Sequence, residues 1–183
     1  MKHYLVTGGA GFIGSHIVEA LLKRGDKVRV LDNFATSKRD NIPAGAELFE
    51  ASITDPEAIA PAFQNVDGVF HTAALPRVQF SIEHPAESND ANINGTLNVI
   101  LASRDAGVKR IVYSATSSTY GDQPVLPLRE DMRPAPKSPY GLQKYVGEEY
   151  LKLARMFWNL ETVSLRYFNV YGPRLTFEGS YVT

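Results

Sequence analysis

Two residues near position 140 have the types and spacing of an acid–base pair. Tyr140 and Lys144 form a Tyr-x-x-x-Lys pattern, and on a helix this spacing places both side chains on one face. A free tyrosine, with a pKa near 10, is a poor base at neutral pH. A neighbouring ammonium stabilises the phenolate, so we expect Lys144 to lower the pKa of Tyr140. The pair predicts a general base, although the pattern alone also suits an ordinary exposed helix face.

A second group of residues has the pattern of a dinucleotide site. Gly8, Gly11 and Gly14 are spaced Gly-x-x-Gly-x-x-Gly within the segment 7–14. Glycines at such positions let the backbone turn sharply, approach a pyrophosphate and pack a helix against a strand. Asp32 lies 18 residues after Gly14, where a carboxylate accepts hydrogen bonds from the adenosine ribose and repels a 2′-phosphate. The sequence therefore predicts NAD as the cofactor.

Three further residues, Lys38, Arg39 and His71, can each be interpreted in two ways. Lys38 and Arg39 leave NADP as a minor alternative, since basic side chains here could meet a 2′-phosphate; beside Asp40 we interpret them as solvated surface charges. His71 ends a predicted strand and could be a general base. We interpret it instead as a histidine packed at the end of the strand.

The elements around these residues alternate between short apolar runs and longer helical segments, which is typical of a parallel sheet with crossover helices. Strands are expected at 4–7, 27–32, 46–50, 68–72, 110–114 and 162–166, and helices at 12–24, 90–105 and 140–157. Leu142, Val146, Tyr150 and Leu153 are expected to form the buried stripe of the last helix. The segment 122–139 contains five prolines and predicts a long ordered loop, functional or merely connecting.

The predicted fold is α/β: a Rossmann-type doubly wound parallel sheet of at least six strands with helices on both faces. At 183 residues and 44% apolar side chains, the chain suits one domain, 1–183. Its 19 basic and 20 acidic residues give no net field that favours nucleic acid or an anionic membrane. The chain has no cysteine, which excludes thiolate metal sites, and we predict no metal. No apolar stretch is long enough for a membrane span, and we expect a cytoplasmic protein.

The order and spacing of the motifs resemble those of the extended short-chain dehydrogenase/reductases, within the NAD-dependent epimerase/dehydratase family. The similarity is greatest to the UDP-glucose and UDP-N-acetylglucosamine 4-epimerases. It runs along the whole chain, through the glycine loop 7–14, Asp32, the segments 71–74, 92–96 and 114–121, the Tyr140/Lys144 pair, and the segment 165–169.

The resemblance implies roles for individual residues. Thr116 is implied to bridge the sugar hydroxyl and the tyrosine, with Tyr140 as the base and Lys144 holding the nicotinamide ribose. The implied cofactor contacts are Gly8, Gly11, Phe12, Ile13, Gly14, Asp32, Asn33, Ser52, Ile53, Ala73, Ala74, Asn92, Ser114, Tyr140, Lys144 and Phe168. The implied substrate contacts are Val78, Thr116, Ser117 and Asn169. Ser52 departs from the family, which usually has Asp there, and Arg77 stands where many relatives have a small residue.

The implied reaction is NAD-dependent epimerisation at C4 of a nucleotide-activated sugar, a UDP-hexose or UDP-N-acetylhexosamine, through a transient 4-keto intermediate. A nucleotide-sugar 4,6-dehydratase is an alternative, but such relatives have Asp-Glu where this chain has Ser117 and Ser118. A net NAD-linked dehydrogenase is another. An NAD-binding module without turnover is the alternative from a different class, because family members continue past Thr183. We therefore expect the C-terminal substrate-binding portion to be absent from this chain.

A homodimer is also implied by the resemblance. Relatives commonly pair two helices from each subunit, and the segments 90–105 and 140–157 match those helices. Their apolar residues include Ile93, Leu97, Ile100 and Leu101. These side chains could equally belong to the core of one subunit.

Overall fold

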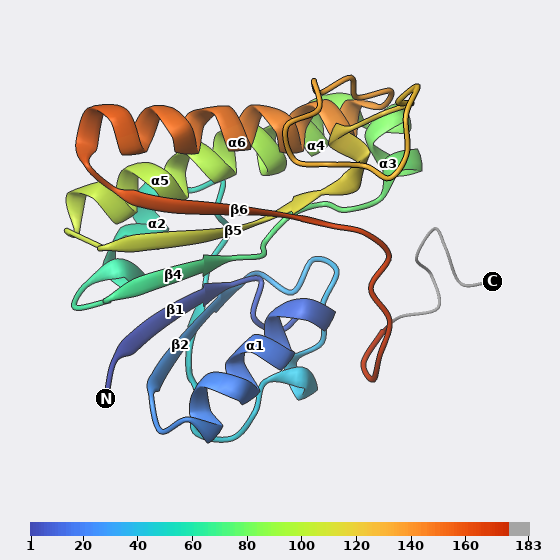
Figure 1. Cartoon of the computed structure of the whole chain (residues 1–183). Helices are drawn as coiled ribbons and strands as arrows, with labels where there is room; N and C mark the ends of the chain where they lie inside the picture. The colour runs from blue at the N-terminus through green and yellow to red at the C-terminus, as the bar shows by residue number, and fades with distance from the viewer. Residues whose placement is uncertain (176–183) are drawn as a thin grey trace.

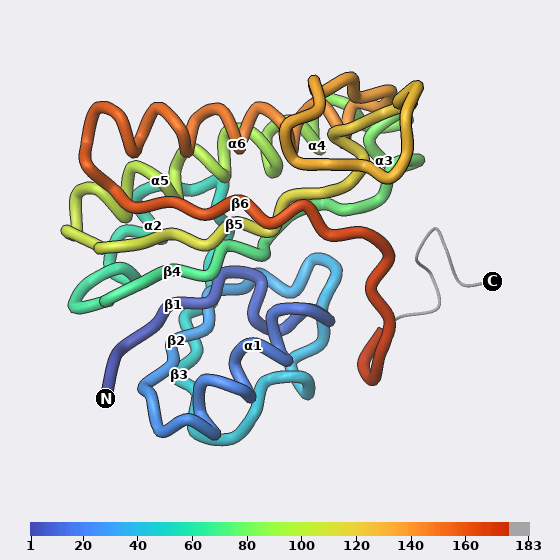
Figure 2. Tube along the Cα trace, in the orientation of Figure 1, coloured from blue at the N-terminus to red at the C-terminus, as the bar shows by residue number. Residues whose placement is uncertain are grey.

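Six parallel strands form the central sheet of the computed structural model, which describes residues 1–175 (Figure 1). The strands are β1 (His3–Thr7), β2 (Lys27–Asp32), β3 (Glu47–Glu50), β4 (Gly68–His71), β5 (Arg110–Thr116) and β6 (Glu161–Tyr167). Their order is β3-β2-β1-β4-β5-β6, and every neighbouring pair is parallel. The predicted fold class is confirmed. Figure 2 traces the same path, with β3 beyond β2.

The direction of winding changes between β1 and β4, which fixes where a ligand can enter. Open α/β sheets bind ligands outside the carboxyl ends of their strands at this switch point. The glycine loop follows β1, and the segment that begins with Thr72 follows β4. Both segments therefore lie at the edge where a ligand is expected.

Helices cover both faces of the sheet (Figure 1). On one face lies α1 (Phe12–Lys23), and on the other lie α5 (Gly95–Asp105) and α6 (Pro139–Trp158). The shorter helices are α2 (Pro56–Ile59), α3 (Val78–Glu83) and α4 (Pro85–Asn89). A π-helical turn, Asp90–Asn94, joins α4 to α5, and 3-10 turns occupy Arg39–Asn41, Ala60–Phe63 and Ser117–Thr119.

The core has two parts because the sheet is buried on both sides. Leu5 and Val6 are neighbours on β1, point to opposite faces, and are both fully buried. Val6 packs with Val18 of α1, whereas Leu5 packs in the larger cluster with Leu151 of α6. Strands covered on both faces by helices are typical of parallel sheets.

The start of α6 is well defined by its sequence. The Ser138 hydroxyl accepts a hydrogen bond from the Gly141 N–H at 3.1 Å, and Pro139 occupies the first turn. Both residue types are favourable at these positions. The segment 122–138 before the helix is irregular, as its prolines predict, and α6 begins one residue before the expected position.

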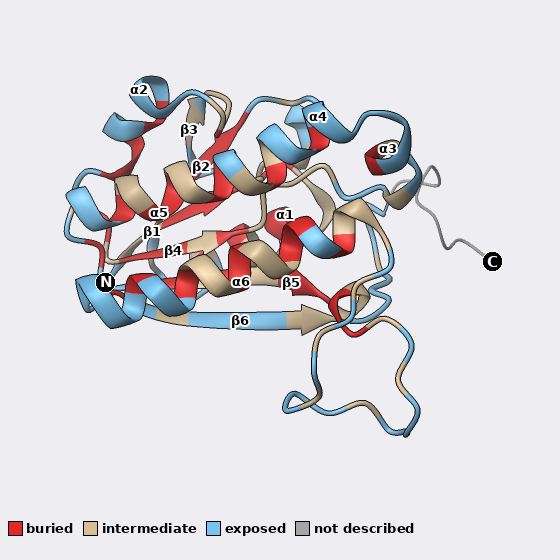
Figure 3. Cartoon of the chain, turned by 90° about the horizontal axis from the view of Figure 1, so that it is seen from above, coloured by how far each residue is buried: buried red, intermediate tan, exposed pale blue. Residues whose placement is uncertain are grey.

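The prediction of the buried face of α6 is wrong. Leu142 and Leu153 are 51% and 45% exposed, and Val146 and Tyr150 are half-buried. The buried positions are Gly141, Gln143, Lys144, Gly147, Glu148, Leu151 and Ala154. The helix therefore packs on the sheet through small and polar side chains together with Leu151, whereas Leu142 and Leu153 are exposed. Figure 3 shows buried and exposed positions alternating along α6.

The segment before and along α5 likewise carries apolar residues that are only partly buried. Ile93, Leu97 and Leu101 are half-buried, whereas Ile100 is fully buried. The apolar residues of these two helices therefore do not all belong to the core. They leave a partly exposed apolar face beside the sheet.

Within residues 1–175, no helix is long and apolar enough to cross a membrane. The same part of the chain contains no group of three or more His, Asp or Glu side chains placed to hold a metal ion.

Candidate dinucleotide and catalytic site

The glycine loop after β1 has a backbone that side chains would disrupt. Gly8 has a φ of +68°, and a Cβ added there would lie 2.6 Å from the Ala73 N. A Cβ at Gly14 would lie 2.2 Å from the Gly8 O. These two glycines bring β1, β4 and α1 into close contact.

Gly11 is different because its surroundings are open. A Cβ added there would meet only the Gly8 O, at 3.2 Å. Gly11 is also the N-cap of α1 and provides no side chain to accept from the first N–H groups of the helix. Free N–H groups at an open helix N-terminus suit a phosphate. The loop therefore fits the pyrophosphate of a dinucleotide.

Asp32, at the end of β2, is held beside this loop. Its Oδ2 accepts from the Ala10 N–H at 3.0 Å, and its Oδ1 accepts from the Phe34 N–H at 2.9 Å and the Ser37 hydroxyl at 2.7 Å. A carboxylate offers about four lone-pair sites, so one remains for a ribose hydroxyl. This arrangement fits NAD.

The basic residues after Asp32 do not form a prepared 2′-phosphate site. Arg39 pairs with Glu50 and lies over the Phe34 ring at 4.3 Å. Lys38 lines a cleft of about 830 Å³ at this edge of the sheet. The cleft is lined by Ala35, Thr36, Ser37, Lys38, Asn41, Leu75, Pro76, Arg77, Phe80, Glu87, Arg174 and Leu175.

His71 is a packed histidine, as we interpret it from the sequence. It is fully buried, and its ring lies between the hydroxyls of Thr7, at 2.7 Å, and Thr96, at 3.0 Å. Burial, with a smaller contribution from the charge of Lys144, lowers the pKa of His71 to about 3. The burial and the two hydroxyl contacts favour the packed histidine over the alternative of a general base.

The three predicted catalytic residues come together from β5 and α6. Thr116 ends β5, and its side chain lies close enough to Tyr140, in the first turn of α6, to lower the pKa of the phenol. Lys144 follows one turn later on the buried face of that helix. The structure thus brings Thr116, Tyr140 and Lys144 to the same end of β5 and α6, and their catalytic roles stay a prediction.

The direction of the Tyr140 pKa shift differs from the expectation. Burial raises the pKa of Tyr140, and the side chain of Thr116 lowers it by less. The prediction that Lys144 lowers this pKa is wrong for the protein alone, because the loss of water around the phenolate dominates. Activation of the base therefore requires further positive charge at the site.

Lys144 is itself strongly perturbed. It is 2% exposed, and burial lowers its pKa to about 7, although the carboxylate of Glu148 opposes that change. Its ammonium lies 4.2 Å from the centre of the Tyr113 ring. A buried amine near neutral pKa beside a tyrosine is typical of functional sites.

Two residues that position the catalytic helix escape the sequence analysis. The Ser81 hydroxyl of α3 accepts from the Tyr140 N–H at 3.1 Å and donates to the Val78 O at 2.6 Å. The Gln143 Oε1 accepts from the Ser88 hydroxyl at 2.8 Å. A lone serine or glutamine has no local pattern that separates it from solvated polar residues. Only the approach of α3 and α4 to α6 shows their role.

Several predicted cofactor contacts are engaged by the chain itself. The Asn92 Oδ1 accepts from the Leu75 N–H at 2.8 Å, and its Nδ2 donates to the Gln143 Oε1 at 2.9 Å. The Ser52 hydroxyl lies 2.8 Å from that of Thr54. These side chains brace the walls of the site, and their contact with a cofactor stays a prediction.

The other predicted contacts lie at the carboxyl edge of the sheet. Phe12 and Ile13 begin α1, Asn33 follows β2, Ala73 and Ala74 follow β4, Val78 begins α3, Ser114 lies in β5, and Ser117 follows it. Ile53 packs so closely on Gly95 that a Cβ there would lie 2.7 Å from its Cδ1. Phe168 is 58% exposed and stacks on Tyr120, and Asn169 is exposed beyond β6.

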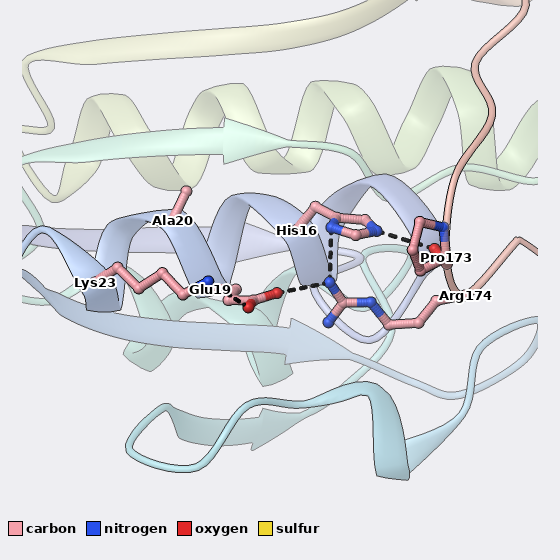
Figure 4. Close-up of a pocket in the computed structure, with 6 residues that line it drawn as sticks. All are labelled: His16, Glu19, Ala20, Lys23, Pro173 and Arg174. Atoms are coloured by element: carbon pink, nitrogen blue, oxygen red, sulfur yellow. Dashed lines mark hydrogen bonds and ion pairs between the residues drawn. The ribbon is translucent and has the colours of Figure 1, made fainter.

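A separate pocket of about 520 Å³ lies on the outer face of α1 (Figure 4). Arg174 donates to the His16 Nδ1 at 2.7 Å and to Glu19 at 2.8 Å, and the His16 Nε2 donates to the Pro173 O at 2.9 Å. Glu19 also pairs with Lys23. These polar groups satisfy one another and fasten the segment after β6 to α1, so the pocket is not the candidate site.

A Rossmann-type sheet, a glycine loop beside an acidic strand end, and a Thr/Tyr/Lys group on β5 and α6 define a short-chain dehydrogenase type of protein. The model of the NAD dependent epimerase/dehydratase family matches residues 4–183. The chain belongs to this family.

Individual relatives agree with that assignment. The UDP-glucose 4-epimerase of Streptomyces lividans is 38% identical over 172 residues, which are 92% of this chain and 52% of that protein. The structure of the Thermus thermophilus UDP-glucose 4-epimerase in complex with NAD is 44% identical, with a TM-score of 0.94 over 97% of this chain and 58% of that one. A UDP-N-acetylglucosamine 4-epimerase from Methanobrevibacter ruminantium, in complex with UDP-N-acetylmuramic acid, is 37% identical, with a TM-score of 0.93 over 98% of this chain and 59% of that one. The chain thus spans about half the length of the curated relatives that it matches.

Proposed function

We propose that this chain contributes the NAD-binding and proton-transfer machinery for epimerisation at C4 of a nucleotide-activated sugar, a UDP-hexose or UDP-N-acetylhexosamine. The observation that carries the proposal is the placement of Thr116 at the carboxyl end of β5 and of Tyr140 and Lys144 one turn apart at the start of α6, at the same sheet edge as the glycine loop. The substrates of the similar epimerases support the sugar class.

The proposed chemistry divides between the cofactor and the chain. NAD, when bound, would accept the hydride from C4, return it to the opposite face of the 4-keto sugar, and supply the positive charge that Tyr140 requires. Tyr140, bridged by Thr116, takes the proton of the sugar 4-hydroxyl and returns it after the 4-keto sugar presents its other face. Lys144 donates hydrogen bonds to the nicotinamide ribose.

The sugar itself is proposed to meet residues around Tyr140. Val78, Ser117 and Asn169 are the proposed substrate contacts, with Asn169 at the phosphates. Ser117 and Ser118 provide no carboxylate next to Thr116. A dehydratase requires an acid and a base to eliminate water, so we favour epimerisation.

The proposal is tested by binding and turnover together. Calorimetry should show one NAD bound per chain, and incubation with NAD and UDP-glucose or UDP-N-acetylglucosamine should yield the C4 epimer. Tyr140→Phe should retain NAD binding and lose at least about a hundredfold in turnover, because the proton acceptor is gone. NAD binding with no sugar binding would support the alternative of an NAD-binding module without turnover. The motivation for that alternative is that the chain matches only about half of the length of its relatives.

We further propose that two copies pair through the partly exposed apolar rows of α5 and α6, with Leu142 and Leu153 among the contacts. Two helices from each copy would bury these rows, which a monomer leaves in water. We also place the protein in the cytoplasm, since a chain without cysteine suits a reducing compartment.

A further inference from the structure

Lys144 lies over the aromatic ring of Tyr113, a residue that takes no part in the proposed reaction. Tyr113, on β5, is fully buried, and the Lys144 Nζ lies 4.2 Å from its ring centre. A cation held over an aromatic face is attracted by the negative charge of that face, and the attraction is largest where water is excluded. Both partners here are almost completely buried.

The helix that carries Lys144 is fitted to this ring. A Cβ added at Gly147 would lie 2.5 Å from the Tyr113 Oη, so residue 147 has to be glycine for α6 to pack at this distance. The Tyr113 hydroxyl also donates to the Lys144 O at 3.4 Å. Tyr113 thus contacts α6 through its face, its edge and its hydroxyl, within one turn of the helix.

A chain of hydrogen bonds on the other side of the Tyr113 ring runs from Asn92 through Thr96 and His71 to Thr7. Thr96 donates its hydroxyl proton to the Asn92 O at 2.7 Å, so it must accept from the His71 Nε2–H. Because burial lowers the pKa of His71 and keeps the ring neutral, its Nδ1 is the acceptor for the Thr7 hydroxyl. Its ring stacks on that of Tyr113, with centroids 5.4 Å apart.

We propose that Tyr113 is a positioning residue whose ring seats the ammonium of Lys144, and that neutral His71, held by Thr7 and Thr96, fixes the orientation of that ring by stacking on it. The inference deepens the proposed function, on which the role of Lys144 rests. A protonated His71 would place a second positive charge beside the seat, so its neutral state is part of the arrangement.

Other groups around Lys144 act on its charge in known directions. Tyr140 and Glu148 face it from α6, His71 from β4 and Tyr113 from β5, while Arg166 of β6 neutralises Glu148 through a paired contact. Glu148 favours the ammonium and burial opposes it. The Tyr113 ring adds a second interaction that favours the ammonium of Lys144, and the ring itself carries no net charge.

The test is a side-chain NMR titration of Lys144 in the 183-residue protein, with Lys144→Arg to assign its signal. In the wild type, the ε-methylene protons should be shifted upfield by the ring current, and the amine should titrate near pH 7. Tyr113→Phe keeps the ring and should preserve both features. Tyr113→Leu should abolish the upfield shift and lower the titration midpoint by about one pH unit.

A fluorinated phenylalanine at position 113 covers the case in which Tyr113→Leu fails to fold. It keeps the shape of the ring but withdraws charge from its face, so the Lys144 midpoint should fall relative to Tyr113→Phe. The proposal would be overturned if the Lys144 ε-methylene signal of the wild type showed no upfield shift. It would also be overturned if the Lys144 titration midpoint were the same with phenylalanine and with fluorinated phenylalanine at position 113. If the wild-type protein bound no NAD in calorimetry, that result would contradict the proposed function instead. The Lys144 titration could still be interpreted, because it is measured without NAD.

Discussion

At the scale of single residues, the glycine loop separates packing from ligand binding. Gly14→Ala should destabilise the fold by about 3 kcal/mol, because its Cβ would lie 2.2 Å from the backbone oxygen of Gly8. Gly11→Ala should change stability by less than about 0.5 kcal/mol, since it has an ordinary φ of −75° and one neighbour at 3.2 Å. Its methyl group enters the proposed phosphate path, so NAD affinity should fall at least about tenfold. Urea unfolding and calorimetry measure the two effects, and an unchanged NAD affinity in Gly11→Ala would move the pyrophosphate elsewhere.

His71 should also give the protein a pH-dependent stability. Its pKa is lowered to about 3 in the folded protein and lies near 6.5 in the unfolded chain, so the unfolded state binds more protons between these values. The free energy of unfolding should therefore fall with decreasing pH in this window, by about 1.4 kcal/mol per unit. Denaturant titrations between pH 4.5 and 6.5 should show a shallower slope for His71→Gln. Equal slopes would mean that His71 becomes charged without unfolding.

At the scale of elements, a buried ion pair joins α6 to the edge strand β6. Arg166 donates to both carboxylate oxygens of Glu148, at 2.8 to 3.1 Å. Glu148→Gln should cost about 2–3 kcal/mol, because it leaves the charge of the partly buried Arg166 uncompensated. Glu149→Gln is the matched control: its pair with Lys152 is exposed and should contribute less than about 0.5 kcal/mol. Similar losses in the two variants would contradict the structural role of the buried pair.

Sequence patterns were sufficient for the strands and the glycine loop because these depend on local features. The glycine spacing, the strand that ends at Asp32 and the Tyr-x-x-x-Lys pair can each be recognised within a short stretch of sequence. The buried face of α6 could not be predicted in this way. Gly147 and Lys144 are buried because Tyr113, about thirty residues earlier, lies beneath them, and no periodicity within α6 records that contact. The same reason hides Ser81 and Gln143.

At the scale of the whole molecule, the apolar residues that a periodicity argument assigns to the core become the evidence for a surface. Leu142 and Leu153 are exposed on α6, and Leu97 and Leu101 are half-buried on the neighbouring helix α5. Exposed apolar rows on two neighbouring helices are costly in water, and a second copy of the same face would cover them symmetrically.

The proposed pairing predicts a specific change in mass. Leu142→Glu combined with Leu153→Glu should convert a dimer to a monomer in sedimentation analysis, because two carboxylates per copy would be desolvated in the interface. Neither side chain contributes to the core, so the thermal unfolding of the monomer should reflect only the lost association. Leu126→Glu is the control, since Leu126 is 76% exposed in the loop before α6 and should leave the dimer intact. A wild-type protein that sediments as a monomer at every concentration would contradict the pairing and leave the rows to another partner.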